Sequence, residues 1–180
     1  MISGPLAAMM LADQGAEVIK VESPGVGDMM RHLGSQKNGM TGIFTLHNRG
    51  KKSIGINLKS AEGRDILKRL LQDADVVIQN FRPGALEKLG FGYEDVRSFN
   101  EGVVYVSISG FGPDGPRSGQ RVYDNVIQAA SGLASVQTDK VTGNPQIFRT
   151  LVCDKVTSYT VAQAVTAALF ARERGRGGQH

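Results

Sequence analysis

One long helical segment constrains this chain more than any other stretch, because residues 155–172 contain neither proline nor glycine. Apolar residues recur there at spacings of three and four, which predicts a helix with one face toward the core. They are Val161, Ala164, Val165, Ala168 and Leu169. Asp154 directly precedes the segment and is predicted to be its N-cap. Since the positive end of a helix favours negative charge, we expect an ionised Asp154 that can act as a nucleophile. The alternative is an aspartate that only caps a core helix.

The rest of the chain alternates between predicted strands and predicted helices. Strands are expected in residues 17–22, 53–57, 74–79 and 103–109, and helices in residues 5–14, 60–73, 93–99 and 123–130. The polar, glycine-bearing residues 29–50 are expected to be irregular. Alternation of this kind is typical of an α/β fold. We therefore predict that residues 1–180 form a single α/β domain, with a Rossmann-like, largely parallel sheet and flanking helices.

The formal charge of +4, from 21 Lys and Arg against 17 Asp and Glu, bears on the kind of partner. The basic residues are scattered apart from the cluster in residues 172–176, so a phosphate-rich small molecule fits this surplus better than nucleic acid. No apolar run reaches membrane-spanning length, and we predict no membrane partner. The single cysteine, Cys153, allows no internal disulfide and indicates a reducing compartment, so we predict a cytoplasmic location.

Three motifs invite a functional interpretation that the residues do not favour. Residues 110–115 (GFGPDG) match the spacing of a dinucleotide-binding loop, but Pro113 and Pro116 predict a rigid loop where a helix should open. Cys153 has no histidine near it in the sequence and is interpreted as a small buried residue, not a nucleophile. The three histidines lack the spacing of metal ligands, so we predict no metal.

Four stretches together carry a resemblance to a known family. They are residues 15–28 (GAEVIKVESPGVGD), 80–84 (NFRPG), 107–116 (SISGFGPDGP) and 154–179 (DKVTSYTVAQAVTAALFARERGRGGQ). In this order they resemble the class III CoA-transferases, a family that includes formyl-CoA transferase, carnitine CoA-transferase and α-methylacyl-CoA racemase. The resemblance implies the front part of the family's large domain, less than half of a family member. The strand that family members carry before the first helix, and their C-terminal half, are expected to be missing.

The resemblance also implies roles for particular residues. Asp154 matches the aspartate that becomes acylated in the family, and acyl-CoA and a carboxylic acid would be its substrates. Contacts with coenzyme A are implied for Lys59, Asn80, Phe81 and Arg82, and the resemblance extends this role to Lys88 and Arg121. For residues 80–82 taken alone, the alternative is a loop whose Phe81 packs inward. Where formyl-CoA transferase has a basic residue after the second strand, this chain has Ser23, which puts one phosphate or adenine contact in doubt.

Tyr123 and Asp124 distinguish between branches of the family. The racemase branch has a His-Asp pair at this point, whereas the transferases resemble this chain in having tyrosine followed by an acidic residue. A tyrosine with a pKa near 10 is a poor base at neutral pH, which favours a CoA-transferase. An acyl-CoA racemase and a non-catalytic truncated remnant are the alternatives. Because full-length relatives form interlaced dimers, the resemblance also implies a homodimer.

Overall fold

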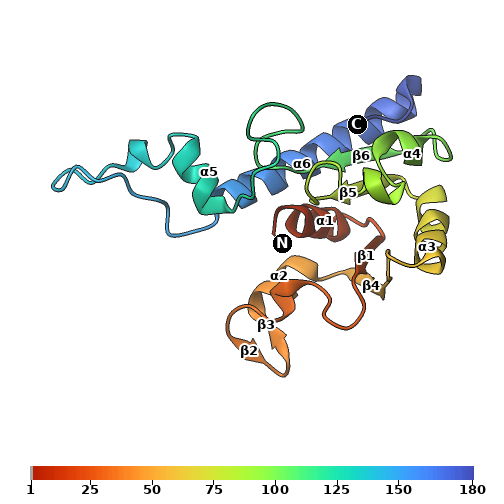
Figure 1. The fold of residues 1–180 in the computed structure, drawn as a ribbon, viewed down its shortest axis with the longest axis horizontal. Coiled ribbons are helices and arrows are strands. Elements are labelled where there is room, and N and C mark those ends of the chain that lie inside the picture. Colours follow the sequence, from red (N-terminus) through yellow and green to blue (C-terminus); the bar gives the residue numbers. More distant parts are fainter. Residues whose placement is uncertain (1) are drawn as a thin grey trace.

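The structure is a computed structural model that describes residues 2–180, and Figure 1 shows its arrangement. The helices are α1 (Ser3–Asp13), α2 (Gly42–Asn48), α3 (Ala61–Gln72), α4 (Tyr93–Arg97), α5 (Asp124–Ala130) and α6 (Val152–Ala171). The strands are β1 (Val18–Glu22), β2 (Gln36–Lys37), β3 (Met40–Thr41), β4 (Lys51–Gly55), β5 (Val76–Gln79) and β6 (Val104–Ser107). Single 3₁₀ turns occur at η1 (Met29–Arg31), η2 (Glu87–Leu89) and η3 (Ser135–Gln137).

Parallel pairing of the longer strands confirms the predicted α/β fold. β1 pairs with β4, and β5 pairs with β6, both in parallel. Within residues 2–180 these are two separate pairs and not one continuous sheet, and β2 and β3 form a small antiparallel hairpin. β6 has a further neighbour on its other side, because Gln179 bridges to Val104 in parallel. The chain therefore returns to the β5–β6 pair after α6 ends.

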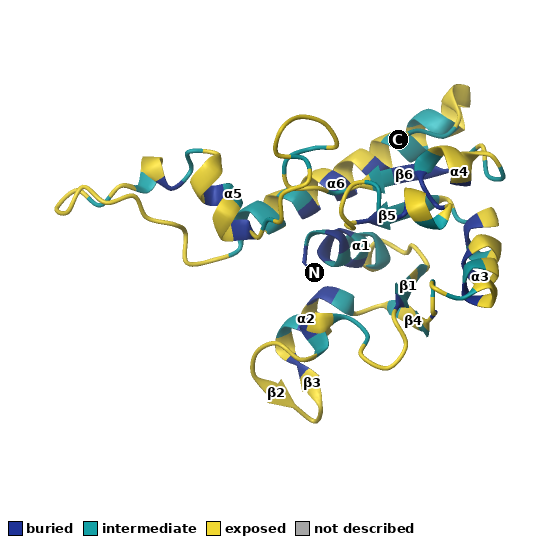
Figure 2. Ribbon diagram, viewed as in Figure 1, coloured by how far each residue is buried: buried dark blue, intermediate teal, exposed yellow. Residues whose placement is uncertain are grey.

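Helices α1 and α6 meet at one apolar contact. α1 packs against α6 and both cover the β5–β6 pair, with Ala7, Val161 and Val165 buried where the helices meet (Figure 2). A second cluster joins α3 and α4 to β6 around Val96 and Tyr105, which are almost fully buried. The remaining core cluster lies between α1, α2 and η1. Val161, Val165 and Leu169 of the predicted apolar face belong to this cluster. Ala164 is instead exposed, and Ala162 is buried in its place.

Two local predictions need correction. The helix predicted from residue 155 begins at Val152, so Asp154 lies within its first turn and Leu151 takes the N-cap position. Residues 29–50 are not wholly irregular, since they contain η1, the β2–β3 hairpin and α2. The Thr41 hydroxyl caps α2 by accepting a bond from the Phe44 N–H at 3.2 Å. That capping signal was present in the sequence, but the short helix behind it has too few residues to show a clear period.

An exposed loop extends from the body of the molecule beyond α5. Residues 140–150 are all exposed and reach outward at the left of Figure 1, before the chain turns back into α6. In residues 2–180 no helix is both long and apolar enough to cross a membrane. The first turn of α6 therefore lies where α1, α5 and this loop meet.

Candidate active site

The first turn of α6 places Asp154 beside two other helices. Its carboxylate Oδ1 accepts a hydrogen bond from the hydroxyl of Ser3, the first residue of α1. Its backbone N–H donates to Oδ1 of Asp124, the first residue of α5, at 2.8 Å. Asp124 thus satisfies one of the free N–H groups that begin α6. The Asp154 side chain, which the sequence predicts to be the helix cap, therefore does not cap α6.

Asp124 is part of a buried polar network. It is 6 % exposed, and its Oδ2 accepts a bond from the Gln128 amide at 2.5 Å. Gln128 is fully buried, and it also binds the loop that leads into α6, accepting from the Phe148 N–H at 2.8 Å and donating to the Thr150 carbonyl at 3.2 Å. Because each of these buried side chains has hydrogen-bond partners, the network fixes the entry of the chain into α6.

Ser158 joins the first residue of α1 to α6 a second time. Its fully buried hydroxyl lies 2.9 Å from the carbonyl oxygen of Ser3 and 2.7 Å from that of Asp154. Gly4 then packs against the end of β5, because a Cβ placed on it would lie 3.6 Å from Cγ2 of Ile78 and 3.9 Å from Cγ of Asn80. The start of α1 therefore lies between Asp154 and Asn80, one predicted nucleophile and one predicted coenzyme contact.

The loop after β5 carries three predicted coenzyme contacts. Gln79 holds its first turn, with Oε1 accepting from the Phe81 N–H at 2.8 Å and Nε2 donating to the Ser107 hydroxyl at 3.0 Å. Asn80 and Arg82 are exposed, and the Phe81 ring is 52 % exposed. The alternative in which Phe81 packs inward is therefore not the one observed. The loop presents an amide, an aromatic face and a guanidinium to solvent.

The other predicted coenzyme contacts come from three separate segments. Lys59 lies in the loop after β4, Lys88 in η2, and Arg121 in the loop that precedes α5, and all are exposed. Within residues 2–180 these cations and Arg82 form no ion pair with a carboxylate. Their charges are thus available to an anionic ligand.

Tyr123 and Asp124 differ in burial, although they are adjacent in the sequence. Tyr123 is 67 % exposed at the N-cap position of α5, whereas Asp124 is buried against Asp154. Cys153, also in the first turn of α6, is half-buried. Burial raises the pKa of its thiol, and the nearby carboxylates of Asp124 and Asp154 raise it further. A thiol held protonated in this way is a poor nucleophile, in agreement with its interpretation from the sequence.

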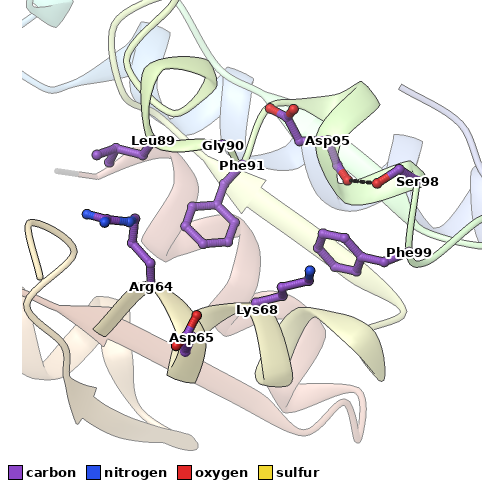
Figure 3. Close-up of a pocket in the computed structure, with 9 residues that line it drawn as sticks. All are labelled: Arg64, Asp65, Lys68, Leu89, Gly90, Phe91, Asp95, Ser98 and Phe99. Atoms are coloured by element: carbon purple, nitrogen blue, oxygen red, sulfur yellow. Dashed lines mark hydrogen bonds between the residues drawn. The ribbon is translucent and has the colours of Figure 1, made fainter. Parts of the chain in front are cut away.

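A cavity of about 270 Å³ lies elsewhere, between α3 and the segment from η2 to α4 (Figure 3). Arg64, Lys68, Phe91 and Phe99 are among its lining residues, and the Lys68 ammonium already lies 5.3 Å from the centre of the Phe99 ring. It is lined by none of the predicted site residues, and α3 and α4 lie at the opposite side of the molecule from α5 in Figure 1. We therefore place the candidate site at α6 and not in this cavity.

Comparison with known proteins decides the family. The family model described as CoA-transferase family III matches residues 1–180. The chain belongs to the CoA-transferase family III. This finding confirms the resemblance that the four motif stretches carry.

The relatives of this family III chain are longer than it is. It is 40 % identical over 176 residues to the probable fatty acyl-CoA transferase Rv3272 of Mycobacterium tuberculosis, covering 96 % of this chain and 44 % of the relative. It is 39 % identical over 177 residues to formyl-CoA:oxalate CoA-transferase of Escherichia coli O139:H28, covering 97 % of this chain and 42 % of the relative. The chain thus spans less than half the length of these two relatives.

Solved structures show the same fold. A CAIB/BAIF family protein from Brucella suis superposes with a TM-score of 0.93 at 38 % identity, over 99 % of this chain and 48 % of that protein. A crystal structure of Rv3272 from M. tuberculosis superposes with a TM-score of 0.89 at 39 % identity, over 99 % of this chain and 50 % of that protein. The α/β fold of this chain is therefore that of the two solved structures, and it covers about half of the length of each.

Sequence reasoning missed the partners of Asp154. Ser3 and Ser158 gave no usable signal, because a single serine at a helix start or on a helix is common. Gln128 carried a weak one, since it follows Asp124 by four residues and such pairs share a helix face. Among residues 2–180 no group of three or more His, Cys, Asp or Glu side chains is placed to hold a metal ion.

Proposed function

We propose that this chain is part of a CoA-transferase that moves CoA from an acyl-CoA to a carboxylic acid through Asp154. The observation that carries the proposal is the placement of the Asp154 carboxylate in the first turn of α6, with a hydrogen bond to Oδ1 alone among residues 2–180. The second oxygen, Oδ2, then has its lone pairs available for attack on a carbonyl carbon.

In the proposed reaction, the Asp154 carboxylate carries first the acyl group and then CoA. Oδ2 of Asp154 attacks the thioester carbonyl carbon, the carbon–sulfur bond breaks, and CoA leaves as a thiolate from a mixed anhydride. The thiolate attacks the aspartyl carbonyl carbon and releases the donor acid as a carboxylate, which leaves an aspartyl-CoA thioester. The acceptor carboxylate attacks that thioester to form a second anhydride and free the thiolate. The thiolate finally attacks the acceptor carbonyl and regenerates Asp154.

The exposed cations support the binding of coenzyme A. Arg82 can form paired hydrogen bonds with a phosphate, and Lys59, Lys88 and Arg121 add charge from three separate segments. Asn80 and Phe81 offer an amide and a ring face suited to the adenine. Ligands of α/β proteins bind at the carboxyl ends of strands, and the Lys59 and Asn80 loops follow β4 and β5 at those ends. Binding energy from the nucleotide would hold the thioester near Asp154.

The two relatives give the proposal its reaction class and leave the substrates open. One is named a fatty acyl-CoA transferase and the other a formyl-CoA:oxalate CoA-transferase. Large apolar side chains on the outer face of α6 support a homodimer, since Val156, Tyr159 and Phe170 are 59 %, 65 % and 63 % exposed. The dimer and the cytoplasmic location both stay predictions.

A non-catalytic chain that only binds CoA is the alternative from another class of function, and the exposed cations would serve binding alone. A racemase is less favoured, because Tyr123 faces solvent and is a poor base. A single assay distinguishes the three functions.

The test is to incubate the protein with formyl-CoA or a long-chain acyl-CoA and to measure its intact mass. We expect an acyl or CoA adduct on Asp154, released by hydroxylamine, and its loss in Asp154→Asn, with transfer falling by at least about a thousandfold. Asp114→Asn, in an exposed loop, is the matched control. An adduct that persists in Asp154→Asn would contradict the proposal. CoA binding without an adduct would favour the non-catalytic chain, and exchange of the α-hydrogen for deuterium without transfer would favour the racemase.

A further inference from the structure

We propose that Ser3 is a positioning residue for Asp154, holding one carboxylate oxygen so that the other faces the thioester. The inference rests on the proposed function for its catalytic consequence. Its structural basis is the hydrogen bond from the Ser3 hydroxyl to Oδ1 of Asp154, which joins the start of α1 to the first turn of α6.

The backbone of Ser3 is held from the same helix that carries Asp154. Ser158 follows Asp154 by one turn of α6, and its buried hydroxyl lies 2.9 Å from the Ser3 carbonyl oxygen. On the other side, Gly4 has Ile78 within 3.6 Å of the position of an added Cβ. The start of α1 is therefore fixed between α6 and β5. Because the backbone cannot move far, the Ser3 Cβ is held beside Asp154, and rotation about one bond directs its hydroxyl to Oδ1.

Two separate contacts on Asp154 divide its positioning between backbone and side chain. Asp124 accepts the Asp154 N–H at 2.8 Å and so fixes the backbone, whereas the carboxylate accepts its hydrogen bond from Ser3. The side chain retains rotation about two bonds, and among residues 2–180 only the Ser3 hydroxyl restrains it by a hydrogen bond. Loss of that hydroxyl should leave α6 in place and release the carboxylate alone.

A free carboxylate would reach the attacking geometry less often. Misplacement of a reacting group by about 1 Å can lower a rate by about a hundredfold. We therefore expect Ser3→Ala to lower the rate of adduct formation at saturating acyl-CoA by about tenfold to a hundredfold. The acyl-CoA concentration at half-maximal rate should change little, because Ser3 is not among the proposed CoA contacts.

The experiment compares Ser3→Ala with Ser3→Thr and with the control Ser98→Ala. The threonine variant would keep a hydroxyl on the same carbon and should recover most of the rate. Ser98 is exposed and donates to a backbone carbonyl in α4, so its replacement should change nothing. Circular dichroism of each variant separates a lost fold from a lost hydrogen bond. Equal rates in Ser3→Ala and the unchanged protein would overturn the role of Ser3 and leave that of Asp154 intact.

A second measurement does not depend on turnover. The carbon-13 resonance of the Asp154 carboxyl carbon should move on Ser3→Ala and return toward its original position on Ser3→Thr. An unchanged resonance in Ser3→Ala would contradict the hydrogen bond itself. Absence of any adduct in the unchanged protein would instead remove the proposed function, and with it the catalytic part of this inference. The two failures are therefore distinguishable.

Discussion

The first turn of α6 and the loops at the carboxyl ends of β4 and β5 form two parts of the candidate site with opposite character. At α6 the polar groups are buried and paired, with Asp124 and Gln128 at 6 % and 0 % exposure. In the loops, Lys59 and Arg82 are exposed and form no ion pair among the described residues. The polar groups at the start of α6 are therefore ordered without a ligand, whereas the charges of the loops are exposed to water.

The difference matches what each part is proposed to do. A nucleophile must be held close to its reacting geometry, and buried hydrogen bonds supply that order in advance. A contact with a flexible polyphosphate tolerates side-chain motion, because charge attraction acts over several ångströms. We expect changes at α6 to alter stability and rate, and changes in the loops to alter affinity.

A charged network supports the base of the β4 loop. Glu22, at the end of β1, receives two bonds from the Arg31 guanidinium, at 2.7 and 2.9 Å, and one from the Ser53 hydroxyl at 2.7 Å. The Asp28 N–H also donates to Glu22, at 2.8 Å. The Arg31 guanidinium, with these further donors, lowers the pKa of Glu22 from 4.5 to about 2 against the opposing effect of burial. The exposed side chains of the β4 loop thus follow a strand that hydrogen bonds to Glu22 hold in place.

The largest effect on stability should come from Asp124→Ala. It removes the acceptor of the Asp154 N–H and of the Gln128 amide, and leaves buried donors without these partners. We expect the free energy of unfolding to fall by about 3 kcal/mol, measured by urea denaturation. Asp65→Ala, on the exposed side of α3, should change it by less than about 0.5 kcal/mol. Equal effects in the two variants would contradict the conclusion that the polar groups at the start of α6 are buried and paired.

A smaller effect is expected from acid on the Glu22 network. Because the pKa of Glu22 is below its unfolded value of 4.5, its stabilisation is complete above pH 4.5 and is lost as the pH falls toward about 2. Glu22→Gln should lower the free energy of unfolding by about 2 kcal/mol at pH 7 and flatten its dependence on pH between 2 and 4.5. Urea midpoints measured across this range provide the check. Glu94→Gln, with 79 % of its side chain exposed, should keep the slope.

The smallest free-energy change should come from Arg82→Ala, and it should appear in binding alone. Loss of one phosphate contact should weaken the binding of CoA about tenfold, or about 1.4 kcal/mol, as measured by calorimetry. Stability should stay within about 0.5 kcal/mol of the unchanged protein. Arg97→Ala, which removes an exposed cation on α4 that pairs with Glu94, is the control. Unchanged CoA affinity in Arg82→Ala would place the nucleotide away from the β5 loop.

Local pattern predicted most of the helices and the longer strands. The helix predicted in residues 60–73 occurs as α3, and Ser60 caps it by accepting from the Gly63 N–H at 3.0 Å. The predicted strands in residues 17–22 and 53–57 occur as β1 and β4, and they pair in parallel. α2 was missed because a short helix depends on its packing against α1, not on a periodic pattern of its own.

The sequence by itself determined most of the helices and longer strands, the family motifs and the presence of an aspartate at the start of the longest helix. Only the tertiary structure decided what holds that aspartate. Its carboxylate partner, Ser3, is 151 positions away in the chain, and its backbone partner, Asp124, is 30 positions away. Periodicity and capping rules describe neighbours within a few residues, so they assigned the cap to Asp154 itself. Packing of α1 and α5 against α6 brought in the other groups, so that Asp124 binds the Asp154 N–H and Ser3 binds its carboxylate.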